Sequence, residues 1–326
     1  MMVSVAMCTY NGAKYLRQQL ESIAKQTVPV NELVVCDDGS VDDTIQIIRE
    51  FSKTSSFSVS IHINEKNLGS TKNFEKCLLL CKGEIIFLCD QDDIWRQDKV
   101  EKQLKYFQEN PGKDAVFSDA EMINGSSQPT GRTIWQEIEF DKSLQNKWIE
   151  GKSHEIMFKG YIVTGATLAI RKACLARLTP FPTNVKDLIH DAWIAMVLGL
   201  EDKIGFIAES LISYRMHESQ QVGFGGNTEF VTVKNRFTRD RKQKLDPIKE
   251  RGDKLHGTYL LLQAVPFVPK EKLTKLYEAQ EHFYKRASLP DNRLLRVIPV
   301  FGQFVRGNYA YSSKDWWLPL VGDLIE

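Results

Sequence analysis

No stretch of the sequence has the roughly 18 consecutive apolar residues that a membrane-spanning helix needs. A large excess of charge is also absent. The net charge is +1 at pH 7, which argues against nucleic-acid binding through a broad basic surface. The apolar run near the N-terminus is too short for a signal peptide and has no basic segment before it. These absences predict a cytoplasmic protein without a nucleic-acid partner.

Zinc-type spacings of cysteine and histidine are missing, although the chain has six residues of each type. The cysteines fall mostly within apolar strand and helix patterns. This favours reduced thiols packed as small hydrophobic side chains, as is usual in the cytosol. Neither a G-x-G-x-x-G loop nor a Walker loop is present. A diphosphate ligand would therefore need another group, such as a metal ion held by carboxylates, to balance its charge.

Short apolar runs alternate with amphipathic helical patterns over the first 120 residues. The predicted strands lie at 3–7, 33–36, 58–63, 85–89 and 115–117. This alternation predicts an α/β fold with a mostly parallel sheet covered by helices. The length of 326 residues predicts about two domains. We place the α/β domain at 1–227 and a smaller helical region at 228–326.

Two segments of the first domain are less regular. Residues 120–160 contain turn signals and no clear period, which predicts a long functional loop region. Residues 161–170 resemble a strand interrupted at Thr164-Gly165. The glycine-rich stretch 220–227 is predicted to be flexible.

Polar residues follow three of the predicted strands at the points where these end. They are Thr9, Tyr10 and Asn11 after the first strand, Asp37 and Asp38 after the second, and Asp90, Gln91, Asp92 and Asp93 after the fourth. The carboxyl ends of parallel strands lie at one edge of a sheet, where α/β proteins bind ligands. The three carboxylates of the last cluster repel one another unless a cation offsets them, and their oxygens suit Mg²⁺ or Mn²⁺. The simplest alternative is an acidic turn exposed to solvent.

Two later features leave alternatives open. Asp191 follows His190 at the predicted start of an apolar helix, where an acidic residue is ordinarily a cap or a partner of the helix dipole. The second domain has a basic stretch at 234–244 and a tail from Arg293 that mixes arginine with aromatic and aliphatic residues. This composition is typical of attachment to an anionic membrane surface, or of a helical appendage packed on the core.

Five motifs, in this order, resemble those of glycosyltransferase family 2. They are Thr9-Tyr10-Asn11-Gly12, Asp37-Asp38-Gly39-Ser40, Asn67-Leu68-Gly69, Asp90-Gln91-Asp92-Asp93-Ile94-Trp95 and His190-Asp191. The resemblance covers about residues 3–220. It implies a GT-A fold, with a Rossmann-like sheet and flanking helices, in an inverting enzyme that uses nucleotide sugars. The Asp-Gln-Asp-Asp-Ile-Trp form, with a later Tyr-Arg-x-His, is similar to bacterial transferases that build O-antigen, capsule or rhamnose-rich wall polysaccharides.

The resemblance also implies roles for individual residues. The expected contacts of the donor nucleotide are Thr9, Tyr10, Asn11, Asp37, Asp38, Asn67, Gly69, Asp90 and Gln91. The expected ligands of Mn²⁺ or Mg²⁺ are Asp90, Asp92 and His217, and the expected contacts of the donor sugar or acceptor are Asp93, Trp95, Gly165, His190 and Trp193. Asp191 matches the catalytic base. The family commonly has an acidic residue before this base, so His190 alters the charge expected beside it.

The reaction implied by the resemblance is a single displacement at the anomeric carbon, with Asp191 as general base and a cation at the departing nucleoside diphosphate. The acceptor would be a glycan or a polyprenyl-diphosphate-linked oligosaccharide, reached by peripheral contact with the inner face of the cytoplasmic membrane. The Gln-x-x-Arg-Trp motif of processive synthases is absent, which favours one sugar per binding event. UDP-sugars and dTDP-rhamnose both remain as donors, because uracil and thymine present the same edge to Asp38.

Other functions stay open at this point. A nucleotidyltransferase on a similar sheet usually carries a glycine-rich basic loop after its first strand, where this chain has only Gly12 and Lys14. A catalytically silent module that binds nucleotide sugars would use the same residues without turnover. A hydrolase with two carboxylates is weaker, because it does not explain Thr9 and Asp38 at the same edge.

Overall fold

The computed structural model describes the chain except for residues 218–240, 314 and 326. It divides into two compact units. The first unit comprises Met1–Gly151, Tyr161–Thr183 and the described residues from Asp187 to His217. The second comprises Lys152–Gly160, Asn184–Lys186 and the described residues from Arg241 onward. The predicted boundary at 227/228, the glycine-rich stretch 220–227 and most of the basic stretch 234–244 lie outside the described residues.

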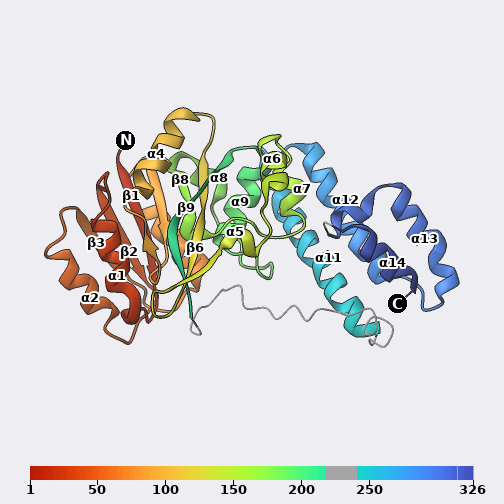
Figure 1. The fold of residues 1–326 in the computed structure, drawn as a ribbon, viewed down its shortest axis with the longest axis horizontal. Helices are drawn as coiled ribbons and strands as arrows, with labels where there is room; N and C mark the ends of the chain where they lie inside the picture. Colours follow the sequence, from red (N-terminus) through yellow and green to blue (C-terminus); the bar gives the residue numbers. More distant parts are fainter. Residues whose placement is uncertain (218–240, 314, 326) are drawn as a thin grey trace. The chain divides into compact units, whose positions relative to one another are not determined.

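Parallel strands form the first half of the sheet (Figure 1). In the spatial order β3 (Ser58–Ile63), β2 (Glu32–Asp37), β1 (Val3–Thr9) and β4 (Ile85–Cys89), each strand is parallel to its neighbour. The connections are α1 (Ala13–Ala24), α2 (Thr44–Ser52) and α3 (Ser70–Leu80). β2 and β4 are buried along their whole length, as expected for apolar runs covered on both faces.

The register of these strands brings the polar clusters to one edge. β1 pairs Thr9 with Asp37 of β2, and it pairs Met7 with Cys89 of β4. The three strands therefore end at nearly the same level, and the residues that follow them emerge together. Each of the six cysteines is a free thiol, as predicted.

The other half of the sheet, in the described part of the chain, mixes parallel and antiparallel pairs. β8 (Ala169–Arg171) runs antiparallel between β4 and β6 (Ala115–Asn124). β9 (Ile204–Met216) is parallel to β6, and β5 (Ile94–Trp95) is antiparallel to β9 at the edge. The segment predicted as an interrupted strand contains a 3₁₀ turn, η1 (Gly165–Thr167), before the short β8. The first unit is therefore α/β with a mixed sheet.

The prediction of a long loop region at 120–160 is wrong. β6 continues to Asn124, and the elements that follow are β7 (Pro129–Thr133), α5 (Ile134–Glu137), α6 (Lys142–Ile149) and α7 (Ser153–Met157). An aromatic cluster organises the elements of this region that precede α7 and belong to the first unit. The ring of Phe117 lies 5.2–6.0 Å, between centroids, from the rings of Trp135, Phe140, Trp148 and Phe206. These contacts join residues far apart in the sequence, so no local pattern indicates them.

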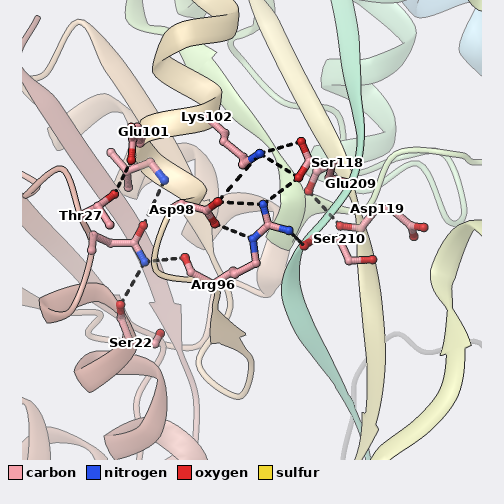
Figure 2. Close-up of polar contacts among 12 residues, drawn as sticks. Ser22, Thr27, Arg96, Asp98, Glu101, Lys102, Ser118, Asp119, Glu209 and Ser210 are labelled. Atoms are coloured by element: carbon pink, nitrogen blue, oxygen red, sulfur yellow. Dashed lines mark hydrogen bonds and ion pairs between the residues drawn. The ribbon is translucent and has the colours of Figure 1, made fainter.

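Figure 2 shows a network of charged side chains that joins the start of α4 (Lys99–Glu109) to β9. Arg96 forms ion pairs with Asp98 and, at 2.9 Å, with Glu209. Lys102 reaches the same Glu209 carboxylate at 2.8 Å. Exposed ion pairs of this kind stabilise a protein only slightly. They nevertheless reinforce the pairing of β5 with β9, the strand whose far end reaches the site described below.

Two further helices of the first unit are α8 (Leu175–Leu178) and α9 (His190–Leu200), and α9 is buried along almost all of its length. In the second unit, α7 is joined by α11 (Arg241–Gln263), α12 (Lys270–Ala287), α13 (Arg293–Val305), η3 (Asn308–Tyr311) and α14 (Trp317–Ile325). A small core of Leu289, Val300 and Tyr309 holds the last three elements together. None of the helices that the structure describes is both long and apolar enough to cross a membrane.

Candidate functional site

A cavity of about 780 Å³ lies within the first unit, at the edge of the sheet where β1, β2 and β4 end. Residues from η1, from the start of α9 and from the end of β9 complete its walls. The predicted site residues that line it are Thr9, Tyr10, Asn11, Asp38, Asp90, Gln91, Asp92, Gly165, His190, Asp191 and His217. The structure thus brings together residues from four of the five motifs, with Gly165 and His217, in a volume typical of ligand pockets.

Six predicted site residues are not among the described residues that line the cavity. They are Asp37, Asn67, Gly69, Asp93, Trp95 and Trp193. Two of them have clear partners elsewhere. The Trp193 indole N–H donates to the carbonyl of Leu178 at 2.8 Å, and the Asp93 carboxylate accepts the backbone N–H of Arg215 at 2.9 Å. These six residues lie outside the wall of the cavity, and their contact with a ligand stays a prediction.

At the end of β2, two carboxylates organise the loops around the cavity. Asp37 is wholly buried and accepts the hydroxyl of Thr9 at 2.7 Å and the N–H of Ser40 at 2.8 Å. Asp38 accepts the N–H groups of Leu68 at 2.7 Å and Gly69 at 2.9 Å. Asp38 therefore fixes the loop that contains Asn67 and Gly69 while it lines the cavity itself. Asn67 and Gly69 are thus hydrogen-bonded to a residue of the cavity wall without lining the cavity themselves.

The acidic centre of the cavity contains Asp90, Asp92 and Asp191. Burial, followed by repulsion from the other two carboxylates, raises the pKa of Asp90 to about 8. Such crowding favours a cation. Asp92 Oδ2 lies 2.8 Å from His217 Nε2, although 125 residues separate them in the sequence. The described residues include no preformed group of three metal-ligating side chains. The donor set of two carboxylates and one imidazole nevertheless suits a divalent ion such as Mn²⁺.

Arg215 supports this centre and received no role from the sequence. Its side chain is fully buried, and its guanidinium donates to the backbone carbonyl of Asp92 at 2.6 Å and to the side chain of Gln18 at 2.7 Å. The guanidinium also lies over the ring of Tyr15, 4.5 Å from the centroid. The only signal in the sequence is the Tyr-Arg-x-His pattern, where Arg215 lies two residues before His217.

Asp191 is held at the start of α9 by two backbone groups. The N–H of Gly165 donates to Oδ2 at 2.8 Å, and the N–H of Ala192 donates to Oδ1 at 2.7 Å. The neighbouring His190 is buried and stacks on Phe74, with 4.0 Å between ring centroids. Burial lowers the pKa of His190, so this ring is neutral near pH 7. His190 therefore places no positive charge beside Asp191.

A search of protein-family models matches the chain, over residues 4–177, to "Glycosyl transferase family 2". The chain belongs to this family. An uncharacterized glycosyltransferase of Methanocaldococcus jannaschii is 29% identical over 66% of this chain and 71% of its own. WfgD of Escherichia coli, named UDP-Glc:alpha-D-GlcNAc-diphosphoundecaprenol beta-1,3-glucosyltransferase, is 31% identical over 44% of this chain. The aligned part spans 56% of that relative.

Two solved structures share the fold of this family 2 chain. TarS 1–349 of S. aureus in complex with UDP-GlcNAc has a TM-score of 0.56 at 18% identity, over 95% of this chain and 93% of its own. The mannosyltransferase PcManGT of Pyrobaculum calidifontis, in complex with GDP-Man and Mn²⁺, has a TM-score of 0.55 at 16% identity, over 98% and 85%. These likenesses establish the GT-A architecture for this glycosyltransferase.

A buried lysine contacts η1, the turn that contributes Gly165 to the cavity wall of the transferase. Lys99, at the start of α4, is 0% exposed, and its Nζ lies 5.0 Å from the centroid of the Trp95 ring and 3.4 Å from the carbonyl of Ala166 in η1. Burial lowers the pKa of Lys99 to about 7, against the smaller opposing effects of Cys89 and Asp93. Gly165 precedes Ala166 in the same turn and donates its N–H to Asp191. Lys99 therefore contacts the turn that positions this carboxylate.

Replacing Lys99 with methionine is expected to change how stability depends on pH. Between pH 7 and pH 10 the unfolded wild type binds one more proton at this lysine than the folded state. Lys99 therefore makes the wild type more stable as pH rises, by up to about 1.4 kcal/mol per pH unit. Urea unfolding should show that the free energy of unfolding of Lys99→Met, measured relative to the wild type, is lower at pH 9 than at pH 7. Lys105→Met, at a 70% exposed side chain of the same helix, should show no such change, and an identical response of both variants would contradict the assignment.

Proposed function

We propose that this chain is an inverting, metal-dependent glycosyltransferase. It moves one sugar from a nucleotide sugar to a glycan or lipid-linked oligosaccharide in the biosynthesis of a bacterial surface polysaccharide. The observation that carries the proposal is the arrangement of the cavity. Thr9 ends β1, Asp38 follows β2, Asp90 and Asp92 follow β4, and Asp191 lines the same cavity. In this proposal the three groups would form a nucleotide subsite, a cation subsite and a base.

Charge in the cavity supports the metal. Asp38, Asp90, Asp92, Asp187 and Asp191 all line it, and Lys14 is the only lysine or arginine among the described lining residues. A nucleoside diphosphate would be repelled by this surface unless a divalent cation bound with it. Asp92 and Asp90 would hold the ion, with His217 as a nitrogen ligand, which favours Mn²⁺ over Mg²⁺. When bound, the ion supplies positive charge for the departing diphosphate.

Asp191 supplies the proton acceptor in this proposal. Backbone N–H groups hold both of its oxygens and fix the orientation of the carboxylate. It would take the proton of the acceptor hydroxyl as that oxygen attacks the anomeric carbon and the bond to the diphosphate breaks. A single displacement of this kind inverts the anomeric configuration. The Cys8 thiol also lines the cavity, but burial raises its pKa to about 11, so it is no nucleophile near neutral pH.

The donor and acceptor are proposed as classes. The base and ribose would lie against Thr9, Tyr10 and Asp38, and a UDP-sugar or dTDP-rhamnose fits this subsite. The name of WfgD specifies a saccharide on diphosphoundecaprenol as its acceptor. We propose an acceptor of the same chemical class here, a polyprenyl-diphosphate-linked oligosaccharide. The enzyme would then work in the cytoplasm, at the inner face of the cytoplasmic membrane.

Thermal unfolding with a panel of nucleotides and nucleotide sugars tests the donor site. A ligand that binds only the folded state should raise the melting temperature by roughly 5 to 10 °C at about a hundred times its dissociation constant. We expect the shift for UDP or dTDP to require Mn²⁺ and to fade in Asp92→Asn. Asp202→Asn, at an ion-paired residue beyond the far end of α9, is the matched control and should keep the shift. If no nucleotide shifts the wild type with any metal, the donor site does not exist.

A further inference from the structure

Helix α13 in the second unit buries mostly polar side chains and exposes apolar ones, the reverse of an ordinary surface helix. Its buried residues are Arg296, Val300 and Gln303, which follow one another along one stripe. The guanidinium of Arg296 donates to the carbonyls of Pro290 at 2.6 Å and Asp291 at 2.9 Å. Two of the three residues that face the protein are therefore polar. A surface helix normally buries its apolar face instead.

The solvent-facing side of α13 is correspondingly apolar. We define the outer face of α13 as Leu294, Leu295, Val297, Ile298, Phe301, Phe304 and Val305, which are 42–83% exposed. Trp316 extends this face by stacking on Phe304, with 5.8 Å between ring centroids, and Trp317 beside it is 51% exposed. Figure 1 shows α13 at the rim of its own unit, away from α11. A contiguous apolar surface of this kind marks an interaction site.

Charge indicates what covers the outer face. Residues 293–313 contain three arginines and no aspartate or glutamate. Two of the arginines, Arg293 and Arg306, are exposed at the two ends of α13. In a symmetric pair of α13 helices, either orientation would place arginine beside arginine, and α13 itself has no acidic residue to offset that charge. An anionic lipid surface instead complements both the arginines and the apolar side chains between them.

Length and composition set the mode of contact. The 13 residues of α13 span about 20 Å, whereas the hydrocarbon core of a bilayer is about 30 Å thick. The helix is therefore too short to cross and would lie in the plane of the interface. Tryptophan side chains prefer this depth, and Trp316 and Trp317 adjoin the apolar residues.

We propose that α13 is an in-plane anchor that binds the protein to anionic lipid membranes through its outer face. The side chains of Ile298 and Phe301 would enter the acyl region, while Arg293 and Arg306 contact lipid phosphates. This proposal rests on the peripheral membrane location given under the proposed function, and it names the segment that makes the contact. Its test uses no glycosyl transfer, so failure of one leaves the other standing.

Cosedimentation of the full chain with vesicles tests the anchor. The wild type should bind vesicles of equal parts phosphatidylglycerol and phosphatidylcholine, and phosphatidylcholine alone much more weakly. The double variant Ile298→Glu/Phe301→Glu should weaken binding by about tenfold or more. Arg293→Gln/Arg306→Gln should weaken it by about tenfold at low salt and little at high salt. Phe267→Glu places a single glutamate at a 62% exposed site outside α13 and should leave binding unchanged.

Three results would overturn the proposal. The wild type could stay in the supernatant with anionic vesicles, or Ile298→Glu/Phe301→Glu could sediment as the wild type does. A third contrary result is a dimer in solution that this double variant converts to a monomer, without any vesicle binding. Thermal melts show whether the variants are folded, and substitutions at such exposed positions should leave the melting temperature within a few degrees.

Discussion

Replacing Asp191 with asparagine is expected to lower kcat by about 10²–10⁴-fold while nucleotide binding is retained. The amide has nearly the same shape as the carboxylate but cannot take a proton from an acceptor hydroxyl. The amide has a single acceptor oxygen, so it can keep the hydrogen bond from Gly165 N–H or the one from Ala192 N–H, and it loses the other. Turnover would be measured with the donor identified by thermal unfolding and a polyprenyl-diphosphate-linked saccharide as acceptor. The nucleotide-induced shift in melting temperature, measured in parallel, separates catalysis from binding.

The matched control also replaces a carboxylate with an amide, but beyond the C-terminal end of α9. Asp202→Asn removes a carboxylate that is ion-paired with Lys113 at 3.1 Å and should keep the wild-type rate. Unchanged turnover in Asp191→Asn would show that Asp191 is only a helix-start residue. If the wild type binds nucleotide without turnover, the chain is a silent binding module. A product that retains the intact sugar-1-phosphate bond would instead indicate nucleotidyl transfer.

Truncation of Phe117 should produce the largest loss of stability among the variants considered. Phe117→Ala removes a fully buried ring that contacts four other aromatic residues, all in the first unit. Deleting a buried phenylalanine costs about 3–5 kcal/mol, because both the transfer energy and the packing around the cavity are lost. This is a large part of the net stability of an ordinary domain.

Urea unfolding followed by tryptophan fluorescence measures this loss, since Trp135 and Trp148 belong to the same cluster. Ile149→Ala removes apolar atoms from the end of α6, where Ile149 is 72% exposed, and should change the free energy of unfolding by less than about 0.5 kcal/mol. Equal losses in the two variants would show that the aromatic cluster does not organise helices α5 and α6.

The ends of the predicted strands allowed both the sheet and part of the candidate site to be predicted from the sequence. Apolar runs stop abruptly at Thr9, Asp37 and Asp90, and each stop is a local signal. The rule that parallel strands end at one edge then places these residues together, without any knowledge of the register. The observed pairing of Thr9 with Asp37 fulfils this rule. Asp191 was singled out only by the resemblance to family 2. Its neighbouring residues do not distinguish a catalytic base from an ordinary acidic residue at a helix start.

Other features depend on contacts that a sequence does not display. Helices α5 and α6 form around Phe117 and Phe206, and the latter comes from β9, far along the chain. Arg215 acquires its role only when its guanidinium reaches the carbonyl of Asp92. The mixture of arginine with aromatic and aliphatic residues after Arg293 predicted membrane attachment or a packed appendage, but it could not show which of these side chains are buried. Lys99 has the sequence of an ordinary helix start, and burial alone distinguishes it from Lys105.

The contact between Asp92 and His217 also limits when the acidic centre can form during synthesis and folding. These residues are 125 positions apart, so at 5–20 residues per second the ribosome adds His217 about 6–25 seconds after Asp92. β9 must then join β6 and β5 before the histidine can reach the carboxylate, and such non-local pairings form late. For this interval the nascent chain carries its acidic residues without their histidine. The centre is therefore completed in one late step, when the last strand of the sheet is in place.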